Sequence, residues 1–191
     1  VINNASVVGN SDAYGYGSGF YLGTAFHSTL SIANSVIWDN GDSTQIYLES
    51  ISNPNVTIAY SDIQAGENGI TDSVGTLTWG SGNIDVDPMF VDTANGNYHL
   101  LASSMLINGG HPDSTDSDGS RADIGVYPYL NSYSGPDWFV ETTGNDTTGT
   151  GASESPFASI QSAINFAATD GDSVAVAAGT YVENINFRGW N

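Results

Sequence analysis

The chain has 191 residues, 21 of them Asp or Glu and only two Lys or Arg, so its formal net charge is −19. Two cations cannot form the basic surface that nucleic acids or anionic membranes require, so we expect neither nucleic acid nor a membrane surface as a partner. Cysteine is absent, which excludes disulfides, zinc–thiolate sites and cysteine nucleophiles.

The composition predicts a mainly β fold. Gly, Ser, Asn, Thr and Asp dominate, charged residues are only 12%, and such a chain favours many short strands joined by turns. No apolar stretch approaches the roughly 18 residues that cross a bilayer, so we expect no membrane insertion. Residue 1 lies in a strand-like run, so we expect either a processed N-terminus or a start in mid-protein.

One sequence pattern occurs three times in the first third of the chain. Residues 1–10 align with residues 31–40, and residues 57–63 repeat the spacing of residues 31–37, at separations of about 30 and then about 26 residues. These separations are typical of stacked structural repeats of roughly 20 to 45 residues. Each copy is a short apolar strand with a polar turn and cannot bury its apolar face alone. The repeats therefore predict a solenoid of parallel strands.

Asn4 and Asn34 occupy matched positions of this repeat. Two interpretations stay open: a stacked asparagine ladder at the bend between strands, or two good turn formers. Residues 45–49 and 56–60 alternate apolar and polar side chains, which predicts two strands with a turn at 53–55. From 84 to 129 the pattern becomes irregular, as expected where a solenoid ends.

Residues 131–136 form a polar stretch with Gly and Pro, which predicts a linker between 1–130 and 137–191. Beyond it, a strand is predicted at 138–140. A helix is predicted at 156–168, with Ser155 as its N-cap, proline at its first position and apolar residues at helical spacing. Residues 173–187 are predicted to form two strands that bend near Gly179.

Residues 138–187 resemble the N-terminal cap and first coil of right-handed parallel β-helix proteins of the pectate-lyase-like superfamily. The Gly-Thr-Tyr-x-Glu-Asn pattern of that first coil stands at 179–184. The motifs NSVIWDN at 34–40, IDVDPMFVD at 84–92 and DSDGSRADIGVYPY at 116–129 are similar to the C-terminal end of bacterial surface proteins of the choice-of-anchor Q type. The resemblance implies a right-handed parallel β-helix whose one short helix plugs the open end of the solenoid, and a place outside the cell or on its surface.

The two resemblances stand in swapped order, with coils and end first, then cap and first coil. If the strand edges at the two termini stay unpaired, other chains can use them as templates. Repeated head to tail, such a match generates a filament, either between copies of the chain or in a tandem array. The alternative is a fragment with disordered flanks. The expected assembly residues are Val1, Ile2, Val7, Ile185, Phe187 and Trp190.

The loop at 113–123 is the candidate metal site. Four carboxylates, Asp113, Asp116, Asp118 and Asp123, lie within eleven residues around a glycine, and calcium takes six to eight oxygen ligands. The loop does not fit the EF-hand register. The alternative is a solvated acidic turn in which Arg121 pairs locally. A second cluster, Asp85, Asp87 and Asp92, is interpreted as exposed rather than metal-binding.

We expect no catalytic residues and no cofactor other than Ca²⁺. Lyases of the superfamily use an Arg or Lys base and bind acidic polymers, which a charge of −19 would repel, and the Gly-His-Gly and Arg-Ile-Lys motifs of its hydrolases are absent. The predicted function is an extracellular structural module that stacks on copies of itself. The alternatives are a carbohydrate-binding or adhesive surface protein and, third, a lyase or glycoside hydrolase with two carboxylates across a cleft.

Overall fold

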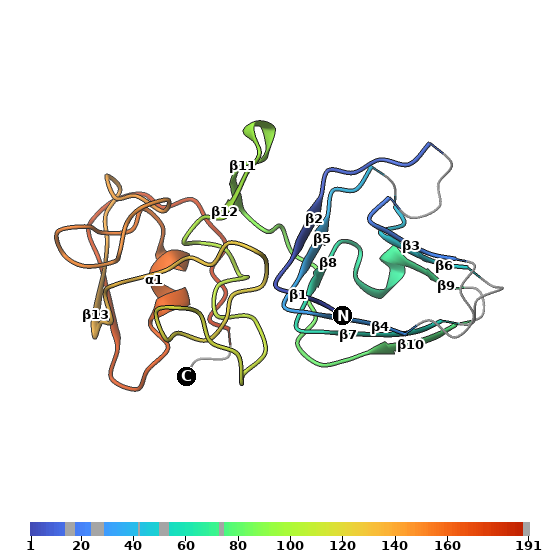
Figure 1. The fold of residues 1–191 in the computed structure, drawn as a ribbon. Coiled ribbons are helices and arrows are strands. Elements are labelled where there is room, and N and C mark those ends of the chain that lie inside the picture. Colours follow the sequence, from blue (N-terminus) through green and yellow to red (C-terminus); the bar gives the residue numbers. More distant parts are fainter. Residues whose placement is uncertain (14–17, 24–28, 42, 50–53, 73–74, 189–191) are drawn as a thin grey trace.

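The computed structural model describes residues 1–13, 18–23, 29–41, 43–49, 54–72 and 75–188. Three parallel sheets form the first half, and successive turns of the chain add a strand to each sheet (Figure 1). The first sheet contains β1 (Ile2–Asn3), β4 (Thr29–Ala33), β7 (Asn55–Ala59) and β10 (Thr76–Trp79). The second contains β2 (Ser6–Val8), β5 (Val36–Trp38) and β8 (Asp62–Ile63), and the third β3 (Phe20–Leu22), β6 (Ile46–Leu48) and β9 (Ile70–Asp72). The predicted mainly β fold with parallel sheets is confirmed.

We call β1–β3 coil 1, β4–β6 coil 2 and β7–β9 coil 3; β10 begins a fourth turn. The strand register reproduces the sequence repeat, since Ile2 lies beside Ile32 and Ile32 beside Ile58. In the second sheet Val7 lies beside Ile37 and Ile37 beside Ile63. The separations of 30 and 26 residues are therefore the lengths of the first two coils.

Apolar side chains from alternate positions of each strand fill the space between the three sheets. In β7, Val56 and Ile58 are buried while Asn55 and Thr57 are exposed, as the period of two in a strand dictates. The same cluster includes Ile32, Ile37, Ile46, Leu48, Ile63 and Ile70. Full burial of such a side chain is worth about 2 kcal/mol, so the stack of coils supplies the main stability of this half.

Each coil bends between its first two strands at a residue in the left-handed backbone region. Asn4, Asn34 and Tyr60 have φ values of 49°, 48° and 49° at matched repeat positions. Asparagine tolerates this conformation better than other non-glycine residues, which explains the first two positions. Tyr60 does not share that tolerance. Its ring packs directly on Gly82, because a Cβ atom at position 82 would lie only 2.2 Å from Tyr60 Cδ1.

The second half contains short elements joined by long turns. β11 (Phe90–Asp92) and β12 (Asn97–Leu100) form an antiparallel hairpin that projects from the molecule, at the top of Figure 1. Two short 3₁₀ turns occur at Gly66–Gly69 and Thr93–Asn95. β13 (Asp137–Val140) pairs in parallel with β14 (Ser173–Val176), and α1 (Ile160–Phe166) lies beside them. No helix among the described residues has the length and apolarity to cross a membrane.

The helix is shorter than the predicted 156–168. It begins after Ser159, whose Oγ accepts the hydrogen bond of Ser162 N, and it ends at Phe166. Phe157, assigned to the helix by its spacing, instead bridges in parallel to Val140 and is fully buried among aromatic rings. Of the apolar residues at 157, 160 and 164, the first therefore belongs to a β-bridge and only the other two to the helix. The prediction of Ser155 as the N-cap was wrong, because Ser159 is the N-cap.

Residues 110–126 lie along the side of the coils rather than over their end. Asn34 O accepts from Gly125 N, Ser6 Oγ accepts from Val126 N, and the ring of Tyr60 contacts His111, so each of the three coils touches this segment. The two halves stand next to each other in Figure 1. The segment from 84 to 129 therefore leaves the end of the stack instead of closing it.

Contacts cross the predicted linker at 131–136. Asn131 N donates to Asp118 Oδ2, and Asn131 Nδ2 donates to Thr150 O. Tyr129 packs on Phe166 of α1, with 5.5 Å between the ring centroids. Residues 97–130 thus pack directly against 137–187, while the division of the chain at 131–136 stays a prediction.

The second strand predicted within 173–187 is absent from the structure, so that prediction was wrong. β14 ends at Val176, and residues 177–187 follow an irregular path. Side chains anchor this path to α1: Glu183 accepts from Ile160 N and Gln161 N, and Asn186 N donates to Gln161 Oε1. These bonds join residues 183–186 to the first turn of α1.

Candidate functional site

Coil 1 is the outermost layer of all three sheets, because β1, β2 and β3 are each the terminal strand of their sheet. The inward-facing side chains of this coil, Ile2, Val7, Phe20 and Leu22, are only partly buried. Their register partners in coil 2, Ile32, Ile37, Ile46 and Leu48, are at most 1% exposed. Equivalent positions thus differ in burial only because coil 2 is covered on both sides. We call this layer the coil 1 edge.

At the opposite end of the stack, the first and third sheets end in uncovered strands within the described ranges, while Ile84 bridges to Asp62 and extends the second sheet by one residue. β10 is the terminal strand of the first sheet, and its inward-facing Leu77 and Trp79 are partly buried, whereas their partners Val56 and Ile58 on β7 are 1% and 0% exposed. β9 ends the third sheet. The two ends present parallel strands of the same direction with apolar side chains between them. A coil placed on either end would continue the sheets.

The predicted assembly residues divide between this edge and the C-terminal segment. Ile2 and Val7 lie in β1 and β2 at the coil 1 edge, and Val1 is 97% exposed beside them. Ile185 and Phe187 are 41% and 65% exposed. They lie in the irregular segment at 177–187, which packs against α1 and forms no strand beside coil 1. Trp190 lies outside the described residues.

A ladder of polar side chains joins the coils at the first bend. Ser35 Oγ accepts from Ala5 N at 3.2 Å, Ser61 Oγ accepts from Ser35 N at 3.3 Å, and Asn83 Oδ1 accepts from Ser61 N at 3.1 Å. Each acceptor satisfies a backbone amide of the preceding coil that the strand ladder does not reach. This ladder was not predicted from the sequence, although Ser35 and Ser61 stand at matched positions of the repeat.

The asparagines form only part of the ladder considered from the sequence. Asn34 Nδ2 donates to Asn3 Oδ1 at 3.2 Å and to Asn4 Oδ1 at 3.5 Å, but Tyr60 occupies the third position and ends the series. A closer pair is found at the second bend, where Asn10 Nδ2 donates to Asn40 Oδ1 at 2.9 Å.

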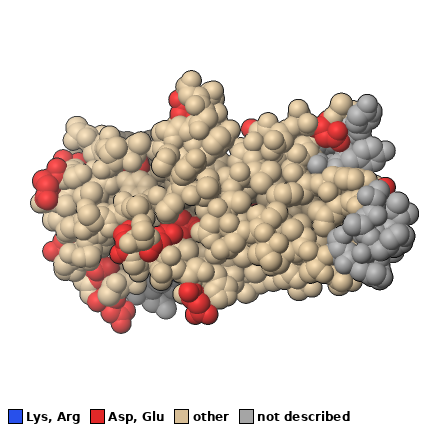
Figure 2. Space-filling view, in the orientation of Figure 1, with Lys and Arg blue, Asp and Glu red and all other residues tan. Residues whose placement is uncertain are grey.

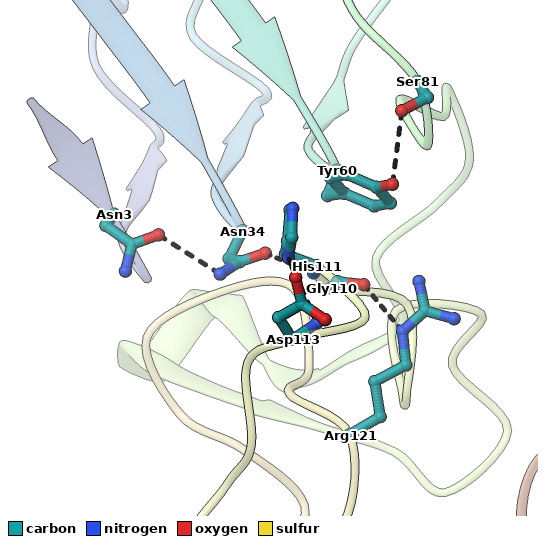
Figure 3. Close-up of polar contacts among 8 residues, drawn as sticks. All are labelled: Asn3, Asn34, Tyr60, Ser81, Gly110, His111, Asp113 and Arg121. Carbon is teal, nitrogen blue, oxygen red and sulfur yellow. Dashed lines mark hydrogen bonds and ion pairs between the residues drawn. The ribbon is translucent and has the colours of Figure 1, made fainter.

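The first bend also holds the second half of the molecule in place (Figure 3). Asn34 Oδ1 accepts from His111 N at 2.6 Å, and the His111 ring lies edge-on to Tyr60 with 4.8 Å between centroids. Tyr60 Oη accepts from Ser81 Oγ at 3.2 Å. Arg121 Nε donates to Gly110 O at 2.7 Å, and its guanidinium lies 5.9 Å from the Tyr60 ring centroid.

The acidic loop directs its carboxylates at backbone amides. Asp116 Oδ2 accepts from Asp123 N, Asp118 Oδ1 accepts from Ser120 N, and Asp123 accepts from Asn108 N and Tyr129 N with its two oxygens. Asp113 points to solvent and its carboxylate is 4.0 Å from His111 Nδ1. The local pairing with Arg121 considered from the sequence is not formed.

Within the described ranges, no group of three or more His, Cys, Asp or Glu side chains is arranged to hold a metal ion. Burial raises the pKa of Asp123 to about 7, with the repulsion of Asp116 and Asp118 adding to it and the two amide bonds opposing it. Burial likewise raises the pKa of Asp116, whereas hydrogen bonds from Ser120 and Asn131 outweigh burial and lower that of Asp118. Calcium binding at this loop stays a prediction.

Asp62 is a buried carboxyl group that the sequence pattern did not single out. It stands in the second sheet between Val36 of coil 2 and Ile84, and none of its surface is exposed. Oδ1 accepts from Val86 N, while Oδ2 has no hydrogen-bond partner among the described residues. Burial raises its pKa to about 8, and the neighbouring Asp85 and Asp87 raise it further against the amide bond. Asp62 is therefore protonated at neutral pH.

The start of α1 is stabilised by two carboxylates rather than by the predicted N-cap. Asp146 Oδ1 accepts from Ala158 N and Ser159 N, and Glu183 accepts the first two amides of the helix. Negative charge is favourable there because the amide groups of a helix start carry partial positive charge. Two members of the segment 179–184, Tyr181 and Glu183, thereby acquire structural roles, since Tyr181 Oη donates to Ala177 O at 3.1 Å.

Acidic side chains gather on the second half of the molecule. In Figure 2 the face of the coils is largely free of charged residues, whereas Asp and Glu cluster around the half that contains α1. The histidines are scattered: His99 stacks on Tyr127, His111 contacts Tyr60, and His27 lies outside the described residues.

Comparison with known families gives one match. A family model described as "Protein of unknown function (DUF1565)" matches residues 142–187, less than half of the chain, and this family is associated with right-handed β-helix proteins. No curated protein and no solved structure is detectably similar to the chain. The matched segment contains α1, β14 and the Gly-Thr-Tyr-x-Glu-Asn pattern, and in this segment the chain is similar to that family.

Proposed function

We propose that the chain is an extracellular structural module, a right-handed parallel β-helix whose coil ends stack head to tail on further coils. The observation that carries the proposal is the partial burial of Ile2, Val7, Phe20 and Leu22 at the coil 1 edge, at positions that coil 2 buries completely. The supporting family association concerns residues 142–187. The place outside the cell follows from the resemblance to bacterial surface proteins.

Head-to-tail stacking is favoured over head-to-head stacking by the strand directions. Translation along the coil axis sets β10 of one copy beside β1 of the next in parallel, as in every pairing inside the three sheets. Head-to-head contact would pair β1 with a second β1 in the opposite direction and close as a dimer.

The expected affinity follows from the side chains that become buried. Each partly buried apolar side chain gains about 1 kcal/mol on full burial, and association costs at least about 4 kcal/mol in lost translational and rotational freedom. With four such side chains at the coil 1 edge and two on β10, the balance is close. We therefore expect stacking at high protein concentration, or within a tandem array where the local concentration is high.

A pair of variants on β1 tests the proposal. Ile2→Asp places a charge on the inward face of the coil 1 edge, while Asn3→Asp places the same charge on the exposed face and keeps the oxygen that accepts from Asn34 Nδ2. Sedimentation velocity across a concentration series and electron microscopy should show axial fibres for the wild type and for Asn3→Asp, and monomers for Ile2→Asp. Circular dichroism confirms that each variant is folded.

A wild-type chain that remains monomeric at its highest soluble concentration would contradict stacking between subunits. Assembly that Ile2→Asp leaves unchanged would show that another surface is responsible. A discrete dimer without fibres would favour head-to-head contact and overturn the head-to-tail arrangement.

Glycan binding is the second candidate, because one pocket has suitable walls. The pocket, with a volume of about 420 Å³, is lined by aromatic and planar polar side chains, including Tyr133, Asn131 and Trp138. Trp138 Nε1 is buried and has no hydrogen-bond partner among the described residues. Binding of a panel of neutral oligosaccharides to the wild type, lost in Tyr133→Ala, would support this candidate. The third candidate, a glycan-degrading enzyme, has no observation in its favour.

A further inference from the structure

The two arginines of the sequence, which contains no lysine, lie at one pocket. Arg121 and Arg188 line it together with Ile84, Val86, Met105, Gly109 and Asn186, and its volume is about 300 Å³. The two arginines are 67 positions apart in the sequence, so only the fold brings them together. In a chain with 21 acidic residues, two like charges at one place are an unfavourable arrangement unless an anion compensates them.

Neither guanidinium group is neutralised within the described part of the chain. Neither has a carboxylate oxygen within the 4.0 Å limit of an ion pair. Arg121 Nε donates to Gly110 O, and Arg188 Nη1 donates to Ile107 O at 2.6 Å and to Asn165 Oδ1 at 3.5 Å. These bonds hold each guanidinium in position and leave further N–H groups of each, Nη1 and Nη2 of Arg121 and Nε and Nη2 of Arg188, without a partner among the described residues.

Asp123 is the acidic side chain closest to acting as a counterion, but its oxygens are already engaged. It attracts Arg188, and both its carboxylate oxygens accept backbone amides, from Asn108 and Tyr129. Burial and the proximity of Arg121 together lower the pKa of Arg188, so the two cations are close enough to repel each other.

We propose that the pocket between Arg121 and Arg188 binds an oxyanion, the carboxylate or sulfate group of a ligand. Guanidinium groups present paired N–H donors that match the oxygens of such groups. Two of them held by backbone carbonyls need little reorganisation on binding, and the amide of Asn186 lies at the same pocket. None of the residues that line the pocket belongs to coil 1.

Calorimetric titration of the wild type with sodium acetate and with sodium sulfate, against sodium chloride at the same ionic strength, tests the proposal. At about 0.15 M ionic strength the repulsion from distant carboxylates is screened beyond about 8 Å. We expect binding of acetate, sulfate or both, and a higher melting temperature than in chloride. Sulfate alone would indicate a tetrahedral group, and acetate alone a planar carboxylate.

Arg121→Gln and Arg188→Gln should each weaken binding at least about tenfold, because each removes charge-assisted hydrogen bonds. Ala94→Asp is the matched control: it changes the net charge by the same single unit on the exposed hairpin turn and should bind like the wild type. Equal binding by all four proteins would overturn the proposal. So would a wild type that binds neither probe, a result that does not depend on whether the arginine variants fold.

Discussion

Replacing Asp62 with asparagine should stabilise the protein at neutral pH. In the folded chain the pKa of Asp62 is about 8, raised by burial, against 3.8 as its ordinary value. Between these two values the folded protein holds a proton that the unfolded chain releases, so the free energy of unfolding falls as pH rises from 3.8 to about 8 and is constant beyond. Asparagine is the same size and has no proton to lose.

The magnitude follows from the width of that pH window. Each pH unit corresponds to about 1.4 kcal/mol, so at pH 7 the ionisable group lowers the stability by about 4 kcal/mol relative to acid. The amide of asparagine would place an N–H group where Asp62 Oδ2 now has no described partner, at a cost of about 1–3 kcal/mol. Asp62→Asn should therefore gain about 1–3 kcal/mol at pH 7 and lose about 1–3 kcal/mol at pH 4, where only the cost of the unpaired amide remains.

Urea unfolding of both proteins at pH 4, 5, 6, 7 and 8 measures this difference. Asp123, with a pKa of about 7, produces a slope of the same sign in both proteins, so it cancels in the comparison. The exposed Asp170→Asn serves as control and should leave the pH dependence unchanged. Parallel stability curves for the wild type and Asp62→Asn would refute a protonated Asp62.

Three further substitutions test the apolar interior, the ladder of polar side chains at the first bend and the start of α1, and a fourth test concerns calcium. Ile37→Ala removes a fully buried side chain between the sheets and should cost about 2–5 kcal/mol in urea unfolding. Ser61→Ala leaves Ser35 N without its acceptor and should cost about 1–3 kcal/mol, measurable in the same way. Glu183→Gln keeps the shape but removes the charge at the start of α1; a loss of about 0.5–1 kcal/mol, smaller at high salt, is expected by calorimetry. If the acidic loop binds calcium, CaCl₂ should raise the melting temperature more than MgCl₂ and Asp118→Asn should abolish the difference; equal effects of the two salts would contradict the calcium prediction.

The repeat was readable from sequence because each coil buries the same kind of side chain at the same position. Ile2, Ile32 and Ile58 recur since all three point into the space between the sheets, and their alignment gave the strand register correctly. Apolar spacing was less reliable where a β-bridge and a helix follow each other in the same run of apolar residues. Phe157 fitted a helix face, yet its backbone bridges to Val140 and the helix begins only after Ser159.

The candidate sites depended on contacts between distant segments. Asp62 occupies a position where coil 1 has Ser6 and coil 2 has Val36, and its burial follows only from the coil and the chain segment on its two sides. The ladder of polar side chains at the first bend could have been predicted from the matched Ser35 and Ser61, but its third member, Asn83, is of another residue type. The C-terminal segment was predicted as a strand because its apolar residues alternate, whereas Glu183 binds it to α1.

The sequence by itself determined the charge, the parallel strands and the lengths of the first two coils. These properties depend on composition and on a short period along the chain, which local residue types encode directly. Only the tertiary structure decided that residues 110–126 pack along the side of the coils, and that Arg121 and Arg188 meet at one pocket. Packing between segments dozens of residues apart depends on the shapes of both surfaces, and no pattern within either segment specifies the other.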